Sequence, residues 1–221
     1  MKISIIVPVY NEEAYIAKCL DSITKQKEKA DEVIVVDNNC TDNTVKIAKE
    51  YPVKIIRERK QGMIYARNRG FDEANGDIIA RCDADVILPE DWVARIKKHD
   101  WKSVAALVGP ARFYDLPIAG TFYSKAYIFF MQKVQQHHTL IGSNMVITKN
   151  IWNTVRKEVC LDDSKVHEDI DLAAHIFNHD GEIVYDPELI VNVSARRIKN
   201  NPESFFLEYP KRLYNTLQSH K

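Results

Sequence analysis

Residues 3–13 read ISIIVPVYNEE, an apolar run that passes directly into a polar loop. A nearly unbroken run of Ile and Val is typical of a strand that is buried on both faces. The same pattern returns at residues 32–42, EVIVVDNNCTD, and at residues 77–86, DIIARCDADV. Three strands of this kind predict a sheet that is covered by helices on both sides.

The segments between these strands have the spacing of amphipathic helices, as in Ile16, Cys19, Leu20 and Ile23. Strand and helix alternate to about residue 110, which predicts an α/β fold with a mainly parallel central sheet. Ligands bind such sheets at the carboxyl ends of the strands. The residues that close each strand are therefore the first candidates for a site.

The second half of the chain is less regular. The pattern predicts a helix over residues 119–138, a strand over 142–150, a helix over 168–181 and a strand over 182–187. No linker or repeat separates these segments, so we expect one domain over residues 1–221. Within it, residues 1–110 form the regular half, residues 111–195 the less regular half, and residues 196–221 a basic and aromatic tail.

The overall charge excludes several classes of function. Lys plus Arg and Asp plus Glu each total 31, so the net charge is zero and a nucleic-acid-binding protein is not expected. Only 7 residues are glycine, and neither GxGxxG nor GxxxxGK[ST] occurs. A Rossmann dinucleotide site and a P-loop are therefore not expected. The sequence also has no signal peptide and no apolar stretch of about 20 residues, which leads us to expect a cytoplasmic protein.

Two acids follow the third strand directly. Asp83 and Asp85 stand at i and i+2, and on an extended segment both carboxylates would point to the same side. Paired carboxylate oxygens suit Mg²⁺ or Mn²⁺ with substrate phosphates as further ligands. A short acidic triplet is also common in surface turns, so the position at a strand end is what favours the metal interpretation.

A second polar triplet, His167-Glu168-Asp169, opens the predicted helix over 168–181. Acids in a first helical turn often only complement the helix dipole. The functional alternative is that one carboxylate is a general base held on a rigid mount.

Five segments together resemble the family 2 glycosyltransferases with the GT-A fold. They are VPVYNEE, IVVDNNCTDNT, GMIYARNRGFDEANGDIIARCDADVILPEDW, GSNMVI and HEDIDLA, and they occur in the family's order. The resemblance implies inverting transfer of a sugar from a nucleotide diphosphate, with Mn²⁺ or Mg²⁺ as cofactor. Uridine diphosphate is the expected carrier, and guanosine and thymidine diphosphates are the alternatives. Residues 1–110 would then be the nucleotide-sugar-binding half and residues 111–195 the acceptor and catalytic half. The implied acceptor is a hydroxyl of a glycan or of a lipid-linked saccharide.

The resemblance also assigns residues. The catalytic pair is Asp169, matching the base, and Glu168, its neighbour near the acceptor, while Asp85 matches the metal ligand. The donor-binding positions are Pro8, Tyr10, Glu12, Asp37, Arg67 and Asp83.

Several points remain open from the sequence. The QxxRW pattern of processive members is missing, which favours non-processive transfer. Arg196 and Arg197 either meet the diphosphate or form an exposed basic turn, and His137, His138 and His167 either complete the metal shell or are structural. The alternative to an enzyme is a nucleotide-sugar-binding protein without turnover.

The tail from residue 196 interleaves basic residues such as Arg212 with apolar residues such as Phe205, Phe206 and Leu213. Such a stretch can lie on an anionic membrane surface. The favoured interpretation is that its apolar side packs on the domain. For residues 126–131 we likewise expect a place in the core or in an acceptor groove.

Overall fold

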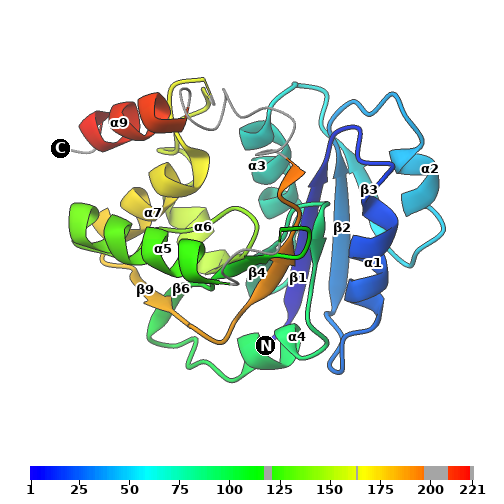
Figure 1. The fold of residues 1–221 in the computed structure, drawn as a ribbon, viewed down its shortest axis with the longest axis horizontal. Coiled ribbons are helices and arrows are strands. Elements are labelled where there is room, and N and C mark those ends of the chain that lie inside the picture. Colours follow the sequence, from blue (N-terminus) through cyan, green and yellow to red (C-terminus); the bar gives the residue numbers. More distant parts are fainter. Residues whose placement is uncertain (117–120, 163, 197–208, 220–221) are drawn as a thin grey trace.

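A computed structural model describes residues 1–116, 121–162, 164–196 and 209–219 of the chain (Figure 1). Its main sheet has seven strands in the order β3-β2-β1-β4-β8-β6-β9. The strands are β1 (Ile3–Val9), β2 (Glu32–Asp37), β3 (Lys54–Arg57), β4 (Ile78–Arg81), β6 (Val104–Val108), β8 (Met145–Thr148) and β9 (Glu182–Tyr185). Only β8 runs antiparallel to its neighbours, so the mainly parallel sheet predicted from the sequence is confirmed.

The helices flank this sheet, with α1 and α2 near one end of the molecule and α5, α7 and α9 near the other (Figure 1). Their bounds are α1 (Ile16–Thr24), α2 (Thr44–Ala48), α3 (Met63–Glu73), α4 (Trp92–Lys97), α5 (Phe122–Gln135), α6 (Lys149–Val155), α7 (Glu168–Asn178) and α9 (Tyr209–Ser219).

Strand β1 shows why the apolar runs are unbroken. Ile5 and Val7 belong to one buried cluster with α1, whereas Ile6 belongs to a second cluster with α3 on the opposite face. Both faces of the strand are therefore apolar, as a sheet between two helical layers requires. Gly70 lets α3 lie directly on the sheet, because a Cβ there would stand 2.3 Å from Ile6 Cγ2.

A second, three-stranded sheet was not predicted. It has the order β5-β10-β7 and consists of β5 (Val86–Ile87), β7 (Ala111–Phe113) and β10 (Val191–Val193). Strands of two or three residues are too short to show a hydrophobic period, which is why the sequence pattern did not reveal them. This sheet matters for the site, because it connects the segment after Asp85 to the segment before Arg196.

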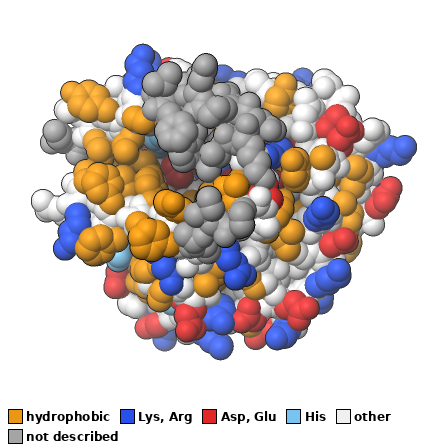
Figure 2. Space-filling view, viewed as in Figure 1, with side chains coloured by type: hydrophobic (Ala, Val, Ile, Leu, Met, Phe, Trp, Pro, Cys, Tyr) orange, Lys and Arg blue, Asp and Glu red, His pale blue; other side chains and the backbone are white. Residues whose placement is uncertain are grey.

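Helix α5 is confirmed, but its predicted place in the core is only partly right. Ile128 and Met131 are buried, whereas Phe129 and Phe130 are about 60% exposed. Figure 2 shows hydrophobic side chains gathered on the side of the molecule where this helix lies. An acceptor groove along α5 is not tested by the structure.

The tail packs on the domain in its described part. Helix α9 contacts α7, and the Thr216 side chain is fully buried. Phe205 and Phe206, which were expected to take part in this packing, lie outside the described residues. Among the described helices, none combines the length and apolar character needed to cross a bilayer.

Candidate active site

The first polar loop begins where β1 ends. Pro8 is buried within β1 opposite Val36, while Tyr10 is exposed beyond it. Asn11 adopts a left-handed backbone with φ 53°, which Asn tolerates better than most residues. This turn directs Glu12 back toward the sheet edge, where its backbone N–H donates to Thr44 Oγ1.

Asp37 closes the neighbouring strand β2 at the same edge. Its Oδ1 accepts the backbone N–H of Cys40 at 2.8 Å, and its Oδ2 lies 4.0 Å from Arg57 Nε. The next residue, Asn38, holds the loop before α3, because its amide donates to the carbonyls of Glu58 and Lys60. These contacts fix Asp37 at the rim and leave its expected donor contact as a prediction.

The two acids after β4 do not lie on an extended segment, which corrects the sequence expectation. The backbone N–H of Val86 donates to the Asp83 carbonyl at 3.1 Å, so Asp83, Ala84 and Asp85 form a turn. The turn separates the two carboxylates. Asp83 accepts a hydrogen bond from Arg81 at 2.9 Å, whereas Asp85 accepts one from Arg196 at 2.8 Å.

Glu168 is held between two buried arginines at the start of α7. Arg67 has no exposed surface and Arg81 is 2% exposed. Burial would raise the pKa of Glu168, but the charges of Arg81 and Arg67 outweigh it and hold that pKa below its usual value. A carboxylate kept ionised and fully engaged in this way is suited to positioning, not to accepting a proton.

Arg67 was expected near the nucleotide. The structure instead directs its guanidinium to Glu168, with a further hydrogen bond from Nε to Asn68 Oδ1 at 2.9 Å. In this conformation the Arg67 side chain has no exposed surface that a nucleotide sugar could contact. A nucleotide contact by Arg67 stays a prediction.

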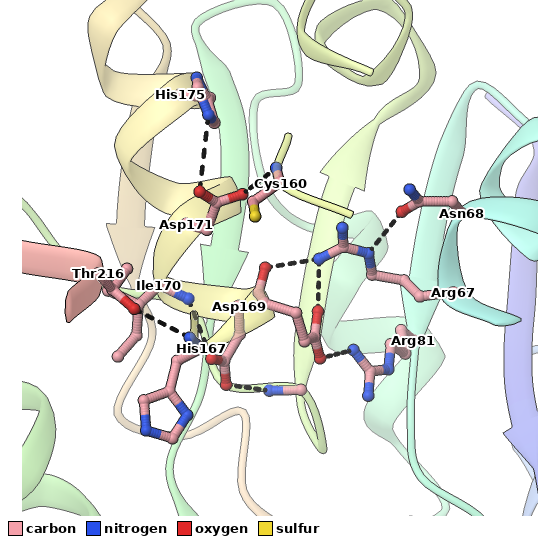
Figure 3. A network of polar contacts seen from close by, with 12 residues as sticks. Arg67, Asn68, Arg81, Cys160, His167, Asp169, Ile170, Asp171, His175 and Thr216 are labelled. Atoms are coloured by element: carbon pink, nitrogen blue, oxygen red, sulfur yellow. Dashed lines mark hydrogen bonds and ion pairs between the residues drawn. The ribbon is translucent and has the colours of Figure 1, made fainter. Parts of the chain in front are cut away.

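Asp169 points away from the arginine pair, toward the segment before β8 (Figure 3). Its Oδ2 accepts the backbone N–H of Gly142 at 3.0 Å, and its Oδ1 accepts that of Ile170 at 2.9 Å. Burial, and then the negative charge of Glu168, raise the pKa of Asp169. The two adjacent acids thus have pKa values shifted in opposite directions, a pattern typical of sites where one carboxyl exchanges protons.

Two arginines join the motifs into one site. Arg81 bridges Asp83 to Glu168, and Arg196 bridges Asp85 to Glu12. The alternative that Arg196 belongs to an exposed basic turn is therefore wrong, because its side chain pairs with two acids from motifs of the predicted site. Arg197 lies outside the described residues.

The three histidines have other surroundings. His137 stacks on Phe177 with ring centroids 4.6 Å apart, and burial lowers the pKa of His138. The backbone N–H of His167 donates to Thr216 Oγ1 at 2.9 Å. Within the described ranges, no group of three or more His, Cys, Asp and Glu side chains is placed to hold a metal ion. A metal at Asp85 would depend on substrate oxygens for further ligands.

Sequence reasoning missed Arg81, although a signal was present. It stands in the otherwise apolar run IIAR of β4, and a charged residue in a buried strand must have a partner. Sequence reasoning also missed Gly142 as a neighbour of Arg81. A Cβ at position 142 would lie 2.9 Å from an Arg81 nitrogen, so the close approach requires glycine.

Comparison with known sequences identifies the family. The family described as Glycosyl transferase family 2 matches residues 4–155. The chain belongs to this family. Glycosyltransferase AglE of Haloferax volcanii is 32% identical over 169 residues, covering 72% of this chain and 54% of AglE. The dolichol-phosphate mannosyltransferase of Pyrococcus furiosus is 36% identical over 102 residues, covering 43% of this chain and 29% of that protein.

Solved structures confirm the GT-A fold of this family 2 chain. The mannosyltransferase PcManGT from Pyrobaculum calidifontis, solved with GDP-Man and Mn²⁺, superimposes with a TM-score of 0.78 at 22% identity, covering 99% of this chain and 63% of that one. Residues 1–349 of TarS from S. aureus, solved with UDP-GlcNAc, give a TM-score of 0.70 at 19% identity, covering 89% and 59%. The chain thus spans about half the length of AglE and under two thirds of either structure.

Proposed function

We propose that this chain transfers a sugar from a nucleotide diphosphate, with uridine diphosphate the expected carrier, to a hydroxyl of a glycan or lipid-linked saccharide. Transfer is inverting, non-processive and dependent on a divalent metal. The observation that carries the proposal is the difference between the two acids at the start of α7. Glu168 is paired with Arg67 and Arg81, and its pKa is lowered. The pKa of Asp169 is raised.

Asp169 acts as the general base in this proposal. Asp169 lies in the first turn of α7, and its carboxylate accepts the backbone N–H of Gly142. The helix and this hydrogen bond together fix the direction of the carboxylate. A raised pKa makes the carboxylate a better proton acceptor, provided that it is ionised at the working pH. Asp169 takes the proton from the acceptor hydroxyl as that oxygen attacks the anomeric carbon, while the diphosphate leaves from the opposite face of the sugar.

The proposed metal position is Asp85. The carboxylates of Asp85 and Glu12 meet on one guanidinium, and among the described residues the buried Glu12 Oε2 has no hydrogen-bond partner. Two carboxylates beyond the carboxyl ends of the neighbouring strands β1 and β4 fit Mg²⁺ or Mn²⁺, with substrate oxygens as the further ligands. Such an ion, when bound, neutralises negative charge on the departing diphosphate.

The donor-binding role proposed for the strand-end loops rests on their shared edge. Tyr10 and Asp83 come after β1 and β4, and Asp37 is the last residue of β2. These three strands are adjacent and parallel. Carboxyl ends of adjacent parallel strands form the usual ligand crevice of an open α/β sheet. Two structural neighbours were solved with GDP-Man or UDP-GlcNAc, which supports nucleotide sugars as the donor class.

A melting screen tests this function first. The full chain is heated with UDP, GDP or TDP in the presence of Mn²⁺, and a donor nucleotide should raise the melting temperature by mass action. Failure of every nucleotide to do so contradicts the proposal.

The second test separates an enzyme from a binding protein. With the nucleotide sugar selected by the screen and a panel of saccharide acceptors, Asp169→Asn should abolish transfer and leave nucleotide binding within about twofold. An Asn variant with full activity would contradict the base assignment. Binding without transfer or hydrolysis in the unaltered chain would favour the alternative of a nucleotide-sugar-binding protein.

A further inference from the structure

Arg196 forms ion pairs with both carboxylates of the proposed metal site, Glu12 and Asp85. Its Nε donates to Asp85 Oδ2 at 2.8 Å, and its terminal nitrogen donates to Glu12 Oε1. The guanidinium also lies over the Tyr15 ring, 4.4 Å from the centroid. One arginine thus occupies two carboxylates that come from motifs far apart in the sequence.

The two carboxylates are held close by this arrangement. Glu12 and Asp85 are only 15% and 16% exposed, so each has lost most of its hydration. Bringing two desolvated carboxylates together is unfavourable unless a cation stands between them. Arg196 supplies that charge in the structure described here.

An arginine and a divalent ion compete for such a pair. Arginine does not lose its proton in proteins, so it cannot release the carboxylates by titration. A divalent ion needs carboxylate oxygen at about 2.0–2.6 Å and repels a guanidinium bonded to the same oxygens. The ion can therefore bind Glu12 Oε1 and Asp85 Oδ2 only after Arg196 has moved.

We propose that Arg196 and a divalent cation are alternative occupants of the Glu12–Asp85 carboxylate pair. Arg196 is the resident counter-ion of the metal-free chain, and Glu12 joins Asp85 as a ligand once the arginine has left. The buried Glu12 Oε2, without a hydrogen-bond partner in the described part of the chain, is a ready position for the incoming ion. This exchange rests on the proposed metal-dependent function and adds to it a second ligand and a competitor.

Mn²⁺ binding to the full chain without nucleotide tests the exchange. The free Mn²⁺ signal in electron paramagnetic resonance gives the Kd directly. Arg196→Gln should lower that Kd about tenfold, because the competing charge is removed. An unchanged or higher Kd would overturn the proposal. In the Arg196→Gln background, Glu12→Gln should reverse most of the gain, and a double variant that binds as tightly as Arg196→Gln would also overturn it.

Arg95 provides a matched control. It bonds Asp91 and Glu188, is 31% exposed against 28% for Arg196, and lies away from the site on α4. Arg95→Gln removes the same charge and should leave the Mn²⁺ Kd unchanged. An equal tightening in this variant would assign the effect to net charge and overturn the exchange.

A measurement on the unaltered chain guards against a variant that does not fold. The Nε–H groups of Arg196 and Arg95 each donate to a carboxylate at 2.8 Å, so both should give resolved signals in nitrogen-proton spectra. Saturating Mg²⁺ should shift or remove the Arg196 signal and leave that of Arg95 in place. An unmoved Arg196 signal at saturation overturns the exchange.

Asp85→Asn distinguishes failure of this inference from failure of the proposed function. If Mn²⁺ binding depends on Asp85 but not on Arg196, only the exchange is wrong. If Mn²⁺ does not bind, or binds equally well to Asp85→Asn, the proposed metal site itself is wrong.

Discussion

Asp83 and Glu168, which lie far apart in the sequence, share the guanidinium of Arg81. Asp83 follows β4, and Glu168 begins α7. Arg81 is 2% exposed and Glu168 13%, so the pair that they form is shielded from water and from salt, whereas Asp83 is 34% exposed. The position of Asp169, next to Glu168, is therefore tied to the position of the turn after β4.

Replacing Arg81 with Met should destabilise the chain by about 3 kcal/mol or more. The substitution leaves Glu168 buried with one of its two cationic partners, and breaking a buried ion pair from one side costs about 3–5 kcal/mol. Urea unfolding measures the change. Arg95→Met removes a more exposed arginine that also bonds two acids, and it should cost less than about 1 kcal/mol. Equal losses in the two variants would contradict the central role of Arg81.

The sequence predicted most of the central sheet because that information is local. The runs at residues 3–9, 32–37 and 77–82 have the composition that a strand buried on both faces requires, and each became a strand. Their order in the chain, with helices between, leaves few topologies open. The placement of Asp37 and Asp83 at one edge follows from that topology.

The partners of the charged residues could not be predicted in the same way. Arg196 reaches Asp85 because β10 pairs with β5, and strands this short leave no periodic signal. The turn at Ala84 separates two acids that an extended segment would have aligned. Ion pairs between distant segments depend on such details of tertiary packing, which residue spacing alone does not contain.

Replacing Thr216 with Val tests the contact between α9 and α7. The buried Thr216 hydroxyl accepts the backbone N–H of His167, which stands at the N-cap of α7. An apolar residue of the same shape leaves that N–H without its partner, at a cost of about 1–3 kcal/mol. Unfolding in urea measures the loss, and amide exchange at His167 should become faster.

Thr154→Val is the control for this substitution. Thr154 is exposed on α6, and its hydroxyl bonds only the carbonyl of Asn150 among the described contacts. We expect a change within about 0.5 kcal/mol. A Thr216 variant as stable as this control would show that α9 does not anchor the start of α7.

Replacing Asp169 with Asn should remove a loss of stability that the unaltered chain undergoes as the pH rises from acidic to neutral. The pKa of Asp169 is raised in the folded state, so folding favours the protonated carboxyl. The resulting stability is present below the unfolded pKa and is lost as pH rises through the folded pKa. Asn carries no charge at any pH, although its amide nitrogen cannot accept one of the two backbone N–H groups that Asp169 accepts. The stability of the Asn variant relative to the unaltered chain should therefore be higher at pH 7 than near pH 3. Urea unfolding at both pH values measures this, and an advantage that grows on acidification would contradict the raised pKa.

Glu168→Gln should move the pH dependence of transfer toward lower pH. The negative charge of Glu168 helps to raise the pKa of Asp169, so its removal lowers that pKa and keeps the base ionised in more acidic solution. The acid limb of kcat/KM against pH, measured with the donor found in the melting screen, reports the change. Glu158→Gln, at an exposed acid beside His175 and His179, should leave the acid limb where it is. A shift toward higher pH in the Glu168 variant would show that Glu168 does not act on Asp169 through its charge.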